Sequence, residues 1–330
     1  MESRVVLFSY DPDMERVCAA AMRSCYSAHP SYDLYTYSTE TVDKLEDERP
    51  FDQQRVKSLL RKAVELDHLD VLEHALLTFD LQHISRACTH QLVRHRLASF
   101  SQQSQRYVRI TRTRGHVRPP SIREDLKIPV RIRGASVEMT FEDMMDVSAQ
   151  MEEGFLGMGI KAEDARYVRP NAAVTNIVTS MNPRQLLHVL SLRCASDAQW
   201  EIRDIAWAMF ACAKLVAPNI FETLPGATAN SYIRERIVKL DRAVKQVERI
   251  FSESQAGKLV EIPMEQVGFE HAVKPFVRKI QRELGALKRA SRTQCRSSRG
   301  RGHSFDSIST GHVASFLNLS ASCTSPTIEP

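Results

Sequence analysis

Length, composition and charge place this chain among globular proteins and exclude several other classes. Its 330 residues suffice for one large domain or two, and 43% of them are hydrophobic. The net charge of +5 is small against 26% charged residues, so charge alone does not indicate nucleic-acid binding. The apolar run within residues 1–10 is too short for a signal peptide or a membrane span. Seven cysteines without a C-x-x-C pair predict a reduced, cytoplasmic protein with neither a disulfide framework nor a zinc site.

The N-terminal part predicts alternating strands and helices. Val56, Leu59, Leu60 and Ala63 recur at helical spacing, which is typical of an amphipathic helix. Ser85 suits a helix N-cap because its side chain can accept a hydrogen bond from the first turn. The expected elements are a strand at 4–10, a helix at 14–27, a loop at 28–52, a helix at 53–66, a strand at 75–82 and a helix from Ser85 to about Arg94.

The middle of the chain predicts a second unit of strand and helix. β-Branched residues alternate in the segment before Asn182, which predicts a strand. Asn182 is a favourable N-cap and Pro183 suits the first helical position. In such a helix Arg184 and His188 share one face, because they are four residues apart. The expected elements are a loop at 97–103, an extended segment at 105–111, a Met-rich helix at 137–158, a strand at 174–181 and helices at 183–194 and 198–216.

Beyond residue 224 the chain changes character. Six apolar residues from Ile233 to Phe251 are spaced 4-3-4-3-4, which is the a/d seam of a helix. This helix packs on its own domain in one interpretation and pairs with another subunit in a second. A further short helix is expected at 272–289. We predict a main domain at 1–224, a helical extension at 225–289 and a disordered Ser/Arg/Gly-rich tail at 290–330.

The most informative stretch is Arg94-His95-Arg96, followed after seven residues by Ser104-Gln105-Arg106-Tyr107. Guanidinium groups offer planar, paired donors that match the oxygens of phosphates and carboxylates. The intervening segment is mostly small and polar, so it is expected to offer N–H groups and hydroxyls to a ligand. Together these features indicate an anion-binding site, with a nucleotide as the expected ligand.

Two other constellations have simpler explanations. His68, Glu73 and His74 cluster without a further ligand at fixed spacing, so a structural role for at least one of them is favoured over a metal site. A nucleophilic role for Ser104 beside His95 would need a setting such as G-x-S-x-G, which is absent there. Ser104 is better explained as a hydrogen-bond donor to a phosphate.

Arg166, Arg184 and Arg193 extend the set of candidate anion ligands. Each alone is more often a surface residue, but together with Asn182 at a helix start they indicate a site for several phosphates. The chain contains neither a Rossmann G-x-G-x-x-G nor a Walker loop. Arginines would therefore bind a dinucleotide in place of a glycine turn.

The order of these motifs resembles that of the flavin-dependent thymidylate synthases, the ThyX family. The family signature R-H-R-x7-S is matched from Arg94 to Ser104, and the segment from His68 to His74 resembles H-x-[ST]-x-x-E-H. The resemblance covers roughly residues 4–222. Further blocks in family order are Ile84–Val93, Glu163–Arg166, Asn182–Arg184, Leu192-Arg193 and Ala198–Arg203.

This resemblance implies an α+β protein, with a mixed α/β fold whose central antiparallel sheet is flanked by helices, followed here by the C-terminal helical extension. It implies a homotetramer with active sites shared between subunits, FAD as cofactor, and NADPH and methylenetetrahydrofolate as co-substrates. The implied reaction is the methylation of dUMP to dTMP, with no membrane or nucleic-acid partner. The Pro-Cys-His tripeptide of the unrelated, cysteine-dependent thymidylate synthase does not occur in the chain.

The matching positions imply roles for individual residues. Arg193 is the implied catalytic residue, because a cation beside uracil N3 and its flanking carbonyl would stabilise the electron-rich ring. The implied cofactor-binding residues are His68, Asp70, Arg94, His95, Arg96, Gln102, Asn182, Arg184 and His188. The implied substrate-binding residues are Gln91, Arg94, Gln102, Ser104, Arg106, Arg166 and Arg193.

The chain departs from the family pattern at several places and leaves two alternatives open. Asp70 stands where the family has Ser or Thr, and its carboxylate would repel a diphosphate unless an arginine shields it. Arg169 precedes Pro170 where Leu is expected. One alternative is a related flavin enzyme that hydroxymethylates another pyrimidine nucleotide, and the other is a non-catalytic nucleic-acid-binding protein. The substrate-site residues favour the synthase, and the modest net charge disfavours nucleic acid.

Overall fold

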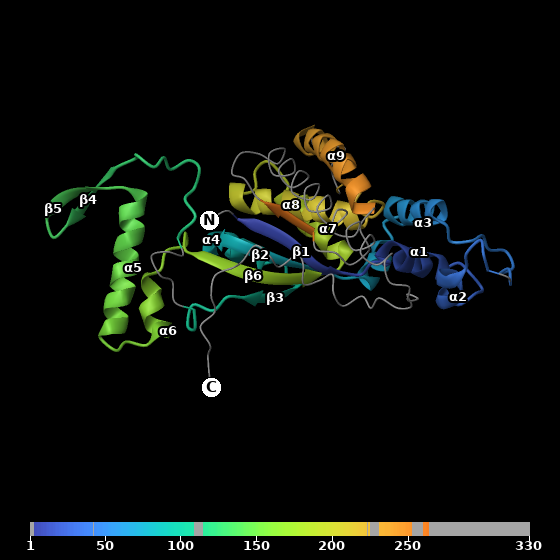
Figure 1. Cartoon of the computed structure of the whole chain (residues 1–330), viewed down its shortest axis with the longest axis horizontal. Helices are drawn as coiled ribbons and strands as arrows, with labels where there is room; N and C mark the ends of the chain where they lie inside the picture. The colour runs from blue at the N-terminus through green and yellow to red at the C-terminus, as the bar shows by residue number, and fades with distance from the viewer. Residues whose placement is uncertain are drawn as a thin grey trace, which may run out of the picture.

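A five-stranded sheet lies at the centre of the molecule (Figure 1). The computed structural model describes residues 3–41, 43–108, 115–222, 224, 231–252 and 260–263, with side chains up to residue 241. The strand order is β3-β6-β2-β1-β7, and every neighbouring pair is antiparallel. These strands are β1 (Arg4–Tyr10), β2 (Leu77–Ser85), β3 (Ser99–Gln102), β6 (Val174–Met181) and β7 (Val260–Pro263). The predicted central antiparallel sheet is confirmed.

Helices cover the sheet and extend it at both ends. The helices are α1 (Met14–Ser24), α2 (Ser31–Thr36), α3 (Gln53–Glu65), α4 (Arg86–Leu92), α5 (Phe141–Gly157), α6 (Ala162–Ala165), α7 (Pro183–Arg193), α8 (Trp200–Val216) and α9 (Ser231–Ser252), with 3-10 turns η1 (Leu69–His74) and η3 (Arg166–Val168). Helices α1 to α3 gather at one end of the sheet, and α5 and α6 lie at the other (Figure 1). Within the described ranges, no helix has the length and hydropathy needed to cross a membrane.

Capping residues explain where several helices begin. Asp52, Ser85 and Asn182 each accept a hydrogen bond from a backbone N–H in the first turn of α3, α4 and α7. Pro183 occupies the first position of α7, where its missing N–H costs no helical hydrogen bond. The caps expected at Ser85 and Asn182 are both confirmed.

The core is organised around α8. Of its 17 residues 13 are buried, so this helix is enclosed by protein on nearly all sides. It packs on β1, β2, α4 and α7, and α9 covers it from outside. The rings of Trp207 and Phe210 lie 5.9 Å apart in this core. Each such side chain contributes roughly 1.5–3 kcal/mol when fully buried.

Residues 128–165 form an arm that projects from the sheet (Figure 1). It consists of a hairpin of β4 (Ile128–Ile132) and β5 (Ala135–Met139), followed by α5 and α6. The predicted helix at 137–158 is wrong in its first turn, because residues 137–139 belong to β5. A capping box between Thr140 and Asp143 sets the true start of α5.

The segment 28–52, expected to be a loop, contains α2. Arg16 of α1 organises this segment. Its guanidinium donates hydrogen bonds to the backbone carbonyls of Tyr35, Tyr37 and Phe51. One partly buried cation therefore satisfies several carbonyls of an otherwise irregular segment.

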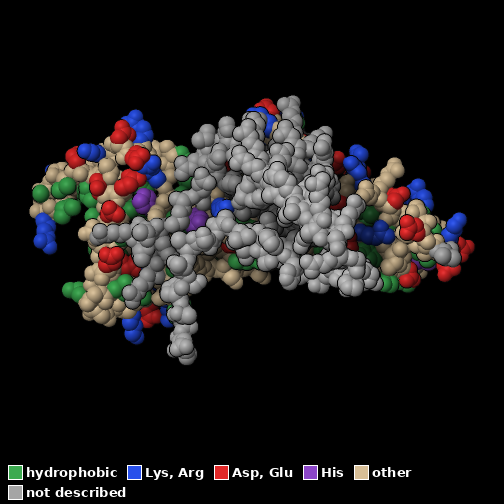
Figure 2. Space-filling model, viewed as in Figure 1, with side chains coloured by type: hydrophobic (Ala, Val, Ile, Leu, Met, Phe, Trp, Pro, Cys, Tyr) green, Lys and Arg blue, Asp and Glu red, His purple; other side chains and the backbone are tan. Residues whose placement is uncertain are grey.

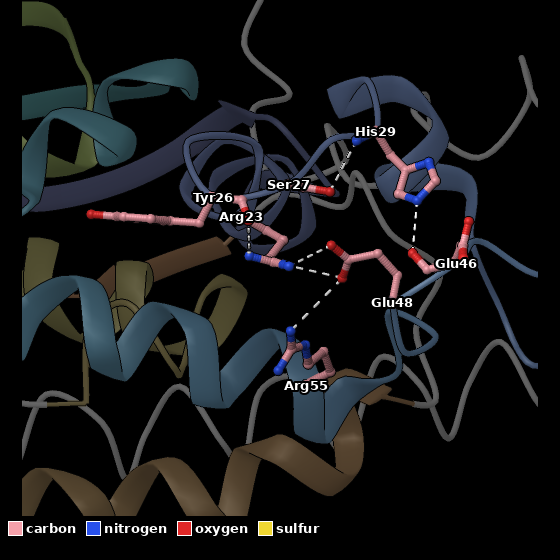
Figure 3. Close-up of polar contacts among 7 residues, drawn as sticks. All are labelled: Arg23, Tyr26, Ser27, His29, Glu46, Glu48 and Arg55. Atoms are coloured by element: carbon pink, nitrogen blue, oxygen red, sulfur yellow. Dashed lines mark hydrogen bonds and ion pairs between the residues drawn. The ribbon is translucent and has the colours of Figure 1, made fainter.

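A second anchor of this segment is Glu48, which lies between Arg23 of α1 and Arg55 of α3 (Figure 3). Its Oε1 is 2.7 Å from Arg23 Nη2, and its side chain is only 1% exposed. Burial opposes ionisation, but hydrogen bonds from Arg23 and Ser27 outweigh it and lower the pKa of the Glu48 carboxyl. Nearby, His29 Nε2 and the Glu46 carbonyl are 2.8 Å apart.

Two predictions around the basic motif are also wrong. The expected loop at 97–103 contains β3, which pairs with β6 from Ser99 opposite Ser180 to Gln102 opposite Ile177. Small polar residues have weak strand propensity, so here the neighbouring strand decides the conformation. Residues 105–107 form a turn where an extended segment is expected, and 109–114 lie outside the described residues.

The C-terminal extension is less purely helical than predicted, because β7 adds a strand to the free edge of β1. In α9, Ile233, Ile237 and Leu240 are buried in the same core as α8. This confirms, for these three residues, the interpretation of a helix packed on its own domain. Lys214 of α8 pairs with Asp241 of α9 at 2.9 Å. The helix expected at 272–289 and the tail at 290–330 lie outside the described residues.

Candidate nucleotide-binding site

A cavity of about 640 Å³ lies at the end of the sheet where β2 and β3 begin and where β1 and β6 end. Its volume is in the range of small-molecule sites. The lining residues come from four separate parts of the chain: Asp11, Glu73–Leu76, Arg96–Ser99 and Ser180–Asn182. Two predicted cofactor-binding residues, Arg96 and Asn182, therefore share one cavity.

Arg184 lies at the start of α7, beyond Asn182. Its Nη1 is 2.5 Å from Oε1 of Glu73, and both side chains are about half exposed. Glu73, one of the three clustered residues considered for a structural role, thus pairs with a predicted cofactor-binding residue. A diphosphate that binds Arg184 must compete with this carboxylate, so the pair moderates the positive charge at the cavity.

Arg193, His95 and Gln91 form a second group, at the C-terminal ends of α7 and α4. Arg193 Nε donates to His95 Nε2 at 3.1 Å, and its Nη2 lies 3.5 Å from the Gln91 carbonyl oxygen. The rings of His95 and His188 are 6.0 Å apart in an edge-to-face arrangement. Two parts of the chain that are distant in the sequence are thus brought together.

This geometry determines the charge of His95. Because Arg193 only donates, Nε2 of His95 must accept, which requires a neutral ring with its proton on Nδ1. His95 is 5% exposed. Burial, followed by the charges of Arg193 and His188, lowers the pKa of His95 from 6.5 to about 4. Arg193 is consequently a fixed cation beside a neutral imidazole.

A third group lies past the other end of β3. Arg106 Nη2 is 3.0 Å from the Glu163 carboxylate, and Arg166 Nε donates to the Glu163 carbonyl at 3.1 Å. Ser104 Oγ accepts from the Arg106 backbone N–H at 3.2 Å. Glu163 therefore connects the two predicted phosphate-binding arginines, a role that its sequence pattern does not indicate.

Arg86 belongs with this third group and is absent from the residues predicted by sequence. It is the first residue of α4, and its backbone N–H donates to the Ala173 carbonyl at 3.1 Å. Burial and the charges of Arg166 and Arg169 lower the pKa of its guanidinium, so these cations lie within electrostatic range of one another. The signal that could have found it is its position shortly before the basic motif, within a block that matches the family.

Gln102 lies between the second and third groups, at the end of β3. Its Nε2 donates to Thr89 Oγ1 at 2.9 Å and contacts Thr175 Oγ1 at 3.4 Å. Thr89 is fully buried, so the Gln102 amide is oriented by a rigid neighbour. Within the described part of the chain its side-chain oxygen has no hydrogen-bond partner, so it could accept from a ligand.

The remaining predicted residues are not drawn into these groups. Arg94 is exposed, and Asp70 is exposed in η1 with no ion pair inside the described part of the chain. The arginine that would shield the Asp70 carboxylate is thus absent from these residues. The His68 ring lies 6.5 Å from the exposed ring of Tyr26, apart from the arginine groups above.

Fold and site together define an α+β protein whose cavity and arginine groups suit a nucleotide. Residues 6–219 match the family described as "Thymidylate synthase complementing protein". The chain is 40% identical over 218 residues to the flavin-dependent thymidylate synthase of Geobacter sulfurreducens, covering 66% of this chain and 85% of that one. It is 33% identical over 253 residues to that of Clostridium tetani, covering 74% and 96%. The chain belongs to the flavin-dependent thymidylate synthase family.

A solved structure supports the same fold. The UMP/dUMP methylase from Streptomyces cacaoi superimposes with a TM-score of 0.52 at 22% identity, covering 70% of this chain and 97% of that one. At this identity the likeness shows the fold alone. The expected fold class is confirmed.

Proposed function

We propose that this protein catalyses the flavin-dependent reductive methylation of dUMP to dTMP, with methylenetetrahydrofolate as one-carbon donor and NADPH as reductant. The observation that carries the proposal is the contact between Arg193 and His95, made within a chain that belongs to this family. NADPH and methylenetetrahydrofolate are part of the proposal because the resemblance to the family implies them.

FAD suits the cavity at the end of the sheet. Arg96 and the Nδ2 group of Asn182 line this cavity and would supply donors for a diphosphate, beside the N-terminus of α7. Arg184, which pairs with the lining residue Glu73, would supply a further donor. Asn182 can serve both purposes, because only its Oδ1 is used to cap α7. When bound, the flavin supplies the hydride chemistry that amino-acid side chains lack.

Arg193 would act on the uracil ring of dUMP. Its contact with His95 leaves the guanidinium charge uncompensated, because neutral imidazole brings no negative charge. A fixed cation beside uracil N3 and its flanking carbonyl stabilises negative charge as C5 becomes nucleophilic. Arg86, Arg106 and Arg166, with the Ser104 hydroxyl, would bind the phosphate of dUMP.

A shared active site in a homotetramer is supported by where the groups lie. Arg96 and Asn182 flank one end of the β3–β6 pair, and Ser104 and Arg106 flank the other, about 10 Å of strand away. Residues from a neighbouring copy would supply the part of each site that one copy leaves open. The arm also exposes an apolar stripe of Met144, Val147 and Met151 along α5, which suits contact with another copy.

The test is whether the purified protein binds FAD and turns over dUMP. We expect yellow protein that releases tritium from C5 of dUMP under anaerobic conditions, only when NADPH and methylenetetrahydrofolate are both present. Omitting each reactant in turn is the internal control, and UMP tests the choice of nucleotide. Colourless protein that fails to bind added FAD would reject the proposal.

A further inference from the structure

Arg169 lies near the third arginine group and is unusual because its charged side chain is buried. Its side chain is 5% exposed, and its Nε is 2.5 Å from Oε2 of Glu152, while its Nη2 bonds Oε1 of the same carboxylate. This is a paired, fork-like contact, which fixes both the position and the plane of a guanidinium. Leu is expected here from the family resemblance, so the resemblance does not predict this ion pair.

The ion pair between Glu152 and Arg169 connects α5 of the arm with the end of η3. Glu152 is the one buried residue of α5, whose other side chains are partly or fully exposed. Ser148, one turn earlier, donates to the Val168 carbonyl at 2.6 Å. The arm is therefore attached to η3 through Glu152 and Ser148, and η3 begins with Arg166.

The same turn connects Arg169 to the anion site. The Arg169 backbone N–H donates to the Arg166 carbonyl at 3.0 Å, which closes η3. The following residues bond to the start of α4, where Ala87 N donates to the Asn171 carbonyl at 3.0 Å. Displacing Arg169 would therefore move Arg166 relative to Arg86.

Stability alone does not explain a buried ion pair at this position. Replacing such a pair with apolar side chains is often neutral or stabilising, because both charges lose their hydration on burial. A fork-like pair, however, fixes one geometry, whereas leucine side chains can pack in several. A fixed geometry matters most where a neighbouring arginine must meet a phosphate.

We propose that Arg169, oriented by Glu152, is a positioning residue that sets the Arg166 guanidinium for the phosphate of the nucleotide substrate. The inference rests on the proposed function and adds to it. Arg169 itself does not touch the substrate in this assignment. It acts through η3, and α5 holds it in place.

The experiment replaces both charges together, as Glu152→Leu with Arg169→Leu, so that neither is left buried and unpaired. Binding of dUMP and of deoxyuridine, which lacks the phosphate, is measured on the FAD-loaded protein by calorimetry. We expect the dissociation constant of dUMP to rise roughly tenfold, since small misplacements of binding groups have effects of this size or larger. Deoxyuridine binding and kcat at saturating dUMP should stay unchanged. Arg169→Lys keeps the charge but loses the fork-like contact. Its dissociation constant for dUMP should lie between those of the unmodified protein and the double variant.

The matched control is Arg118→Leu with Glu142→Leu, which removes an ion pair of 2.9 Å at the other end of α5. It should leave both dissociation constants unchanged. Unaltered dUMP binding in the Glu152 and Arg169 variant would overturn the proposal, as would equal weakening of dUMP and deoxyuridine. If the unmodified protein fails to bind dUMP, the proposed function fails first, which is a distinguishable result.

Discussion

At the residue scale, the chemistry of the site depends on a small number of charges whose partners lie far away in the sequence. Arg193 and His95 are 98 residues apart yet share a hydrogen bond. The contact orients the Arg193 guanidinium, and burial together with the charge of Arg193 keeps the His95 ring neutral to a lower pH than usual. Both properties are testable without knowledge of the full reaction.

Arg193→Ala is expected to retain flavin but to lose methylation of dUMP. Cofactor binding depends on other residues in our assignment, whereas stabilisation of the uracil ring depends on this cation. Removing one such group typically lowers kcat by about 10²–10³. Flavin absorbance and tritium release from dUMP measure the two properties separately. Arg61→Ala, on the exposed face of α3, should change neither. Full activity of Arg193→Ala would remove this residue from its assigned role.

His95 should make the flavin-free protein less stable as the pH falls from 6.5 towards 4. The unfolded chain takes up a proton near pH 6.5, whereas the folded protein resists until about 4. The difference between these two pKa values corresponds to about 3 kcal/mol at most. The contribution of the neutral His95 ring to the free energy of unfolding is thus fully present above pH 6.5, and it declines as the pH falls from 6.5 to about 4. Urea unfolding measures the effect.

His95→Gln should flatten that pH dependence, because glutamine does not titrate. His90→Gln, which alters an exposed histidine of α4, is the control and should retain it. Identical pH profiles for the unmodified protein and His95→Gln would contradict the assignment of a neutral, buried ring.

At the element scale, ion pairs and hydrogen bonds add to apolar packing in holding the irregular segments in place. Glu48 connects α1 with α3 (Figure 3). Arg16 donates to the carbonyls of the segment between them. In the extension, Lys214 and Asp241 connect α8 with α9. Such contacts fix the relative positions of helices that apolar packing alone would leave less defined.

Glu48→Gln is expected to destabilise the protein by about 3 kcal/mol, because two partly buried arginines lose their counter-ion. The lowered pKa of Glu48 means that its stabilising effect is present above its ordinary pKa of 4.5 and is lost as the pH falls below it. Urea unfolding at pH 7 measures the difference. Glu46→Gln, two residues away and exposed, is the matched control and should have little effect. Equal stability of the two variants would argue against a structural role for the Glu48 pair.

At the scale of the whole molecule, the arm is the part with the least core of its own. Figure 2 shows hydrophobic side chains on its surface beside charged ones of both signs. Met144, Val147 and Met151 of α5 are each more than 40% exposed. In the homotetramer that we propose, contact with further copies of the chain would cover this surface.

Met151→Glu should therefore reduce assembly, because a carboxylate would be buried in the contact between copies. Light scattering after size-exclusion chromatography should report a smaller species than for the unmodified protein. Glu153→Gln, an exposed change on the same helix, should leave the assembly intact. An unchanged mass for Met151→Glu would exclude this face of α5 as the interface.

The amino-acid sequence by itself determined the local features. Caps at Ser85 and Asn182, the period of the helix at 53–66 and the alternation at 174–181 depend on neighbours a few residues away, so they can be read directly. The motifs likewise indicate the family through their residue types, spacing and order along the chain. Only the tertiary structure decided which partner each charge acquires. Glu163 between two arginines, Glu152 beside Arg169 and β3 against β6 all depend on segments that meet only after folding. Pairing across such separations leaves no periodic pattern, because its energy comes from burial and distant charges.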